Sequence, residues 1–141
     1  TLRDRKQWIN IMFGQMEYAP IVATSALEGK GIKELLNTAI ELHQQLNHKV
    51  DTAALNAALK DWLFKYPPPA SKTNKFKIRY MVQTKSNPVE FLIFATRPEV
   101  VPDTYVTFLK NRIREDLGFD KIPVQVEFKA SRQKWEDRQF D

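Results

Sequence analysis

The fold is decided by residues 75–96, which read KFKIRYMVQTKSNPVEFLIFAT. Over residues 75–83 apolar and polar side chains alternate, which is typical of a strand with one buried face. The turn at 86–88 leads into 89–96, a nearly continuous apolar run that predicts a central strand. The predicted inward face of the first strand holds Phe76, Ile78, Tyr80 and Val82, and its outward face holds Lys75, Lys77, Arg79 and Gln83, with Met81 as the exception.

Two helices and a third strand are predicted around this pair. Thr52 can cap a helix that reaches residues 62–66 and ends at three prolines. Residues 102–118 predict a second helix, because apolar side chains recur every three or four positions and Gly118 can end it. Alternation over 124–128 predicts the third strand. The fold class is therefore α+β: a small αββαβ sandwich, with a three-stranded sheet and helices on one face.

The first part of the chain predicts a partial α/β unit. Its order is a helix over 2–16, a short buried strand over 20–23, a loop, and an apolar-striped helix from Ile32. One strand and two helices are too few to close a core. We therefore expect a partial domain over 1–50, an αββαβ domain over 51–131, and a basic, polar tail over 132–141.

Composition and charge exclude several classes of function. The 141 residues carry 22 Lys and Arg against 17 Asp and Glu, a net charge of +5, and residues 52–141 hold the whole excess. Such asymmetry suggests that the second part faces an anionic partner. The absence of cysteine excludes disulfides, thiolate metal sites and cysteine nucleophiles. No apolar run approaches the ~18 residues of a membrane span, so we expect a soluble, cytoplasmic protein with no membrane partner.

No catalytic or metal motif is present. With four glycines the chain cannot contain a phosphate-binding GxxxxGK[ST] loop. His43 and His48 stand five positions apart on a predicted helix, so we expect surface residues rather than a metal pair. Residues 74–77 (Asn-Lys-Phe-Lys) lack the carboxylate of the Asn-Lys-x-Asp element that binds guanine. We therefore expect no catalytic residue and no metal ligand in this chain.

Basic residues concentrate around the first predicted strand. Side chains on one strand face project at intervals of about 7 Å, close to the phosphate repeat of an extended nucleic-acid strand. Such contacts supply affinity through counterion release and read no sequence. Alternatively, lysines on an edge strand prevent pairing between sheets. Because Phe76 and Tyr80 are assigned to the core, base stacking is not expected. The candidate RNA- or partner-binding residues are Lys72, Lys75, Lys77, Arg79, Lys85, Lys110, Arg112, Arg114, Lys129 and Arg132.

The loop between the predicted strand and helix carries a second motif. Residues 21–32 read IVATSALEGKGI. This resembles the last guanine-nucleotide motif of translation-factor-type GTPases, in which backbone N–H groups around the alanine face the guanine carbonyl. The resemblance assigns a guanine-facing role to Thr24, Ser25, Ala26 and Leu27. An ordinary tight turn between a strand and a helix is the alternative.

Two further blocks extend the resemblance. Residues 77–96 contain KIRY and, after it, NP, and residues 108–115 read FLKNRIRE. These two blocks resemble the carboxyl-terminal KH-like domain of the Der (EngA) family, and together with the loop the resemblance runs over roughly residues 17–131. These bacterial GTPases have two tandem G domains and assist assembly of the large ribosomal subunit. The resemblance implies that residues 1–50 end the second G domain, whose phosphate loop and Asn-Lys-x-Asp element would precede Thr1.

The resemblance also implies partners and cofactors. A KH-like module of this family would contact ribosomal RNA of the large subunit and the first G domain of the same protein. GTP or GDP is expected in the parent protein only, and no GTP hydrolysis is expected from this chain. Era, another ribosome-assembly GTPase, has a KH domain with a Gly-x-x-Gly loop, whereas residues 97–102 here (Arg-Pro-Glu-Val-Val-Pro) lack it. The alternatives are an Era-like KH end and a protein-docking module that binds no RNA.

Overall fold

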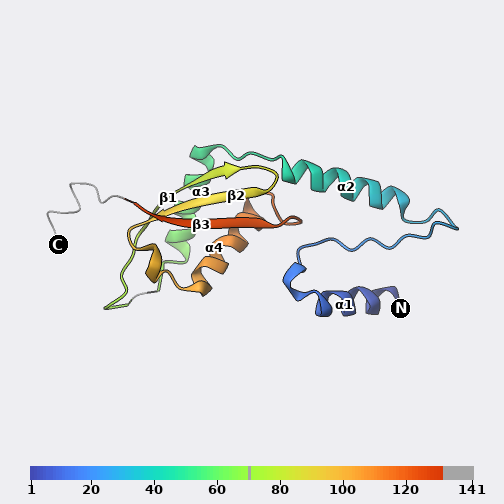
Figure 1. Ribbon diagram of the computed structural model, residues 1–141, viewed down its shortest axis with the longest axis horizontal. Helices are drawn as coiled ribbons and strands as arrows, with labels where there is room; N and C mark the ends of the chain where they lie inside the picture. The colour runs from blue at the N-terminus through green and yellow to red at the C-terminus, as the bar shows by residue number, and fades with distance from the viewer. Residues whose placement is uncertain (70, 132–141) are drawn as a thin grey trace.

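The computed structural model describes residues 1–69 and 71–131. Its core is a three-stranded sheet in the order β1-β2-β3, in which β1 and β2 are antiparallel and β2 and β3 are parallel. Figure 1 shows the elements in chain order. They are α1 (Leu2–Met12), η1 (Gly14–Met16), α2 (Ile32–Leu46), α3 (Thr52–Lys65), β1 (Ile78–Lys85), β2 (Val89–Ala95), η2 (Pro98–Val100), α4 (Asp103–Asp116) and β3 (Val124–Ala130).

Helices α3 and α4 pack on one face of this sheet, which confirms the predicted α+β sandwich. The alternate residues of β2 that face the helices are buried, and Phe91 and Ile93 have no exposed surface. Trp62 of α3 donates from Nε1 to Oδ2 of Asp116 at 2.7 Å, so the one polar atom of its ring is satisfied. The helix residues that complete the core are Leu55, Leu59 and Trp62 of α3, and Tyr105, Leu109 and Ile113 of α4.

The prediction of which side chains of this segment face the core holds for Phe76 and Ile78 and is wrong beyond Arg79. Met81 is fully buried, whereas Tyr80 is 44 % exposed. Ile78 pairs with Ala95 but Tyr80 pairs with Phe94, so Arg79 is an extra residue in β1. A bulge of this kind shifts the alternation by one position and reverses the two faces beyond it.

The side chain of Asn56 fixes this bulge. Its Nδ2 donates to the carbonyl oxygen of Met81 at 3.0 Å, and its Oδ1 accepts from the Met81 amide at 2.9 Å. Both backbone groups of Met81 are thus bonded to α3 on the outer edge of the sheet. Met81 is thereby turned toward the helices and Tyr80 toward the opposite face.

Residues 1–50 form helices without a buried core of their own. No residue of α1 or α2 is buried. The predicted helix 2–16 is interrupted at Phe13, where α1 ends and the short helix η1 follows. The predicted strand at 20–23 is wrong, because no strand in the described part of the chain lies beside it to supply hydrogen bonds; the nearest pairing is an isolated bridge between Ser25 and Lys30. In residues 1–69 and 71–131, no helix is long and apolar enough to cross a membrane.

Candidate nucleic-acid interface

Three of the candidate lysines lie in the segment that leads into β1. Lys72, Lys75 and Lys77 are all exposed, and the last two precede the strand rather than belonging to it. Lys77 is anchored by its backbone, since its amide donates to Thr96 Oγ1 at 2.8 Å and its carbonyl accepts from the Thr96 amide at 2.9 Å. The predicted spacing along one strand face therefore does not apply to Lys75 and Lys77, but both remain open to solvent.

Lys129 lies near the same end of the sheet. It is exposed on β3, in register with Phe94 of β2. Just beyond it, the amide of Ser131 donates to the carbonyl of Ala95 at 2.8 Å. The start of β1 and the last residues of β2 and β3 thus meet, and we call this region, with Lys75, Lys77 and Lys129, the basic end of the sheet.

Most of the other candidate residues contact groups within the protein. Lys85 forms an ion pair with Glu90 at 3.4 Å at the far end of β1. On α4, Lys110 is half-buried, and Arg112 forms ion pairs with Glu115 and Asp116. Arg79 is half-buried at the bulge and has a partner of its own. Arg132 lies outside the described residues. The basic end therefore offers more available positive charge than the rest of the predicted set.

Arg114 joins the KH-like part to the first part of the chain. Its guanidinium lies 3.9 Å above the ring centroid of Tyr18, and its Nη2 donates to the carbonyl of Ile122 at 3.1 Å. Burial lowers the pKa of this guanidinium, while Tyr18 and Asp120 act in the opposite direction. These contacts leave Arg114 less accessible to RNA than the sequence suggested.

Two aromatic side chains that were not expected at the surface lie on the helix-free face of the sheet. Tyr80 and Phe94 stack there, with ring centroids 4.4 Å apart and planes inclined by 17°. The signal was Met81, the apolar residue on the predicted polar face. An apolar residue out of phase in an otherwise alternating strand indicates a bulge, and a bulge reverses the assignment of Tyr80.

The predicted guanine-facing loop is a compact turn directly before α2. The amide of Ser25 donates to the Lys30 carbonyl at 2.9 Å, and Ser25 Oγ accepts from the Glu28 amide at 3.3 Å. Thr24, Ala26 and Leu27 are exposed, and Leu27 is 97 % exposed. A Cβ on Gly31, whose φ is +77°, would lie 2.1 Å from the Ala23 carbonyl oxygen, so only glycine fits. The turn thus presents backbone, small side chains and the large apolar side chain of Leu27 to solvent.

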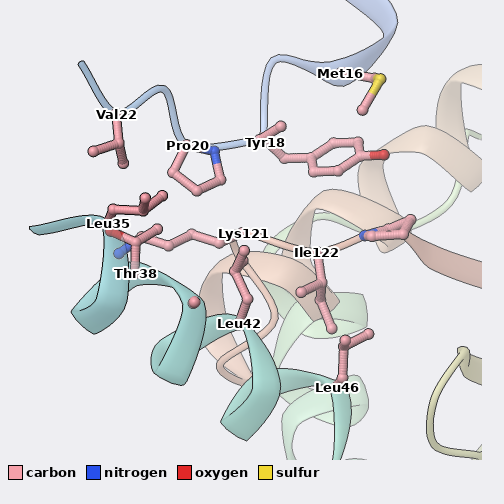
Figure 2. A pocket seen from close by; sticks show the side chains of 13 residues that line it. Met16, Tyr18, Pro20, Val22, Leu35, Thr38, Leu42, Leu46, Lys121 and Ile122 are labelled. Carbon is pink, nitrogen blue, oxygen red and sulfur yellow. The ribbon is translucent and has the colours of Figure 1, made fainter. Parts of the chain in front are cut away.

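A pocket of about 460 Å³ opens between residues 16–22, α2 and residues 121–123 (Figure 2). Tyr18, Pro20 and Val22 line it from one side, α2 from another, and residues 121–123 from a third. Its walls are mostly apolar. They consist of Met16, Tyr18, Ala19, Pro20, Val22, Leu35, Thr38, Ala39, Leu42, Leu46, Lys121, Ile122 and Pro123.

Polar contacts beside the pocket attach α2 to the loop after α4. Lys121 Nζ donates to Glu41 Oε1 at 2.6 Å, which raises the pKa of Lys121. The Gln45 side chain bonds Asp120 Oδ1 at 2.7 Å and the Lys121 amide at 3.0 Å. His48 Nε2 lies 3.1 Å from the Leu117 carbonyl oxygen. Helix α2 is thus fixed to the KH-like part by several bonds.

His43 and His48 are both exposed, as expected. Across residues 1–69 and 71–131 no group of three or more His, Cys, Asp or Glu side chains is placed to hold a metal ion.

The comparisons with known proteins identify the family. The family described as KH-domain-like of EngA bacterial GTPase enzymes, C-terminal, matches residues 49–129. The chain is 47 % identical to GTPase Der of Treponema pallidum over 125 residues, which are 89 % of this chain and 27 % of that protein. It is 39 % identical to GTPase Der of Novosphingobium aromaticivorans over 116 residues, 82 % of this chain and 25 % of that protein. The chain thus spans about a quarter of the length of these relatives. The loop, the αββαβ order and these matches together show that the chain belongs to the Der (EngA) family of bacterial GTPases.

Proposed function

We propose that this chain supplies a Der-family GTPase with a KH-like module that contacts ribosomal RNA during assembly of the large subunit. The basic end of the sheet carries this proposal. Lys75, Lys77 and Lys129 are exposed and lie near one another without an ion-pair partner among the described residues. Amino groups in such an arrangement attract several phosphates at once and release their counterions.

The loop over 24–27 supports a role in nucleotide binding by the parent protein. Backbone and the small side chains of Thr24 and Ala26 are exposed before α2, as close approach to a guanine base requires, and the Leu27 side chain is exposed beside them. GTP or GDP would bind the parent GTPase domain, in which this loop forms one wall. The chain itself, without a phosphate-binding loop, would not hydrolyse GTP.

The contacts of α2 suggest how nucleotide and RNA binding are connected. The loop continues directly into α2, and Glu41, Gln45 and His48 attach the far end of that segment to residues 117–121. A change at the loop would therefore be transmitted to the KH-like domain. The nucleotide state of the parent would then determine which surface of the module meets RNA or the first G domain.

A salt titration of binding to a structured fragment of large-subunit ribosomal RNA tests the proposal. We expect a log–log slope of several units, reduced by about one in each of Lys75→Ala, Lys77→Ala and Lys129→Ala. Lys33→Ala, which removes an exposed lysine of α2, is the matched control and should leave the slope unchanged. Absence of RNA binding at low salt, with binding to the first G domain retained, would instead establish a protein-docking module.

A further inference from the structure

The helix-free face of the sheet carries an aromatic pair and a lysine in one row. Tyr80 of β1 is in register with Phe94 of β2, and Phe94 is in register with Lys129 of β3. The neighbouring residues Ile93 and Ala95 are buried against the helices, so Phe94 faces the other way. We call Tyr80, Phe94 and Lys129 the sheet platform.

The backbone holds Tyr80 on this face. The bulge at Arg79 and the two hydrogen bonds from Asn56 turn Met81 into the core, and its neighbour Tyr80 must then point outward. The Tyr80 ring lies against Phe94 at 4.4 Å, which fixes the orientation of the ring while 44 % of the residue stays exposed. An aromatic ring that is both oriented and exposed is ready to stack on a planar partner without further ordering.

Charge is distributed unevenly along this face. Lys129 belongs to the platform itself, and the basic end of the sheet is next to it, with Lys77 bonded to the residue that follows β2. Glu127 lies at the middle of β3, in register with Leu92 and two positions before Lys129, and the opposite end of the sheet carries the Glu90–Lys85 ion pair. Phosphates are therefore attracted to the end that holds the aromatic pair.

We propose that the sheet platform binds an unpaired RNA base, which stacks on the exposed face of Tyr80 while its phosphates lie near Lys129 and Lys77. The proposal rests on the proposed RNA contact and specifies its substrate as single-stranded RNA. Every base has a π-face, so such stacking tolerates any sequence. Exposed aromatics on a sheet face, flanked by basic side chains, stack unpaired bases in other RNA-binding sheets.

The test compares single- and double-stranded RNA on the full chain. The probes are a fluorescein-labelled twelve-nucleotide oligouridylate and a duplex RNA of the same length. Stacking predicts that Tyr80→Ala and Tyr80→Leu weaken single-strand binding about 5-fold to 150-fold, with little change for the duplex. Tyr80→Phe keeps the ring and should bind within about 2-fold of wild type. Phe64→Ala, which removes an 86 % exposed aromatic of α3, is the control and should have no effect.

The variants separate a folding defect from a lost contact. Tyr80→Leu keeps apolar cover over Phe94, so its thermal unfolding should resemble that of wild type. If folded Tyr80→Leu and Tyr80→Ala bind the oligonucleotide as wild type does, the platform is overturned, and the lysine-dependent salt slope still decides the proposed function. If wild type binds neither RNA at low salt, both proposals fail. If the Tyr80 variants bind RNA as wild type does but no longer bind the first G domain, this face is a protein-docking surface and the proposal is overturned.

Discussion

Replacing Asn56 with alanine removes the side chain that holds the bulge of β1. Two hydrogen bonds to the Met81 backbone, at 3.0 Å and 2.9 Å, are lost together. Each contributes about 1 kcal/mol net, and the amide and carbonyl of the buried Met81 are left without their protein partner. We therefore expect the free energy of unfolding to fall by about 2–3 kcal/mol.

Urea unfolding followed by circular dichroism measures this loss. With an m-value of about 1–3 kcal/mol/M, the midpoint should fall by about 0.7–3 M. Asn111→Ala, at an exposed position of α4, is the matched control and should change stability by less than about 0.5 kcal/mol. An Asn56→Ala midpoint equal to that of the control would refute the reasoning that Asn56 fixes the register of β1.

Two further predictions concern Tyr105 and Gly31. Burial raises the pKa of Tyr105 to about 12, and its hydroxyl donates to the Tyr66 carbonyl at 2.9 Å. Its contribution to stability is thus complete below pH ~10 and is lost as the pH rises toward 12. Tyr105→Phe should lower the free energy of unfolding by about 1 kcal/mol at pH 7, measured by urea unfolding, and should abolish the fall in stability between pH ~10 and ~12. A variant that loses stability over this pH range as wild type does would contradict the prediction. Gly31→Ala should rearrange residues 23–31, seen as amide shifts in NMR spectra, and cost about 1–3 kcal/mol if the loop is retained; a superimposable spectrum would count against the close approach to Ala23.

The order of elements in the KH-like part could be predicted from local patterns. The alternation of apolar and polar residues over 124–128 and the apolar stripe over 102–118 each indicate a segment that is buried on one side. The family was also predicted, because the loop at 24–27 and the later blocks are conspicuous in the sequence itself.

The faces of β1 were predicted only in part, because the side chain that fixes them is distant in sequence. Asn56 lies 25 positions before Met81, and the strand itself contains only the out-of-phase Met81 as a sign of the bulge. The same holds for Arg114, whose partner Tyr18 belongs to another part of the chain. The strand expected at 20–23 illustrates a related limit: an apolar run indicates burial, but strand geometry requires a neighbour.

Helix α2 is long enough for a small rotation at one end to move the other end by several ångström. Its 15 residues extend over about 22 Å, from the loop at one end to Glu41 and Gln45 near the other. A tilt of about 10° around the loop end displaces the far end by roughly 4 Å. Hydrogen bonds such as those from Gln45 and Lys121 tolerate only a few tenths of an ångström, so they would break or carry residues 117–123 with them. A small angular change at the turn before α2 is thereby converted into a translation of a few ångström in the sheet-bearing part of the chain.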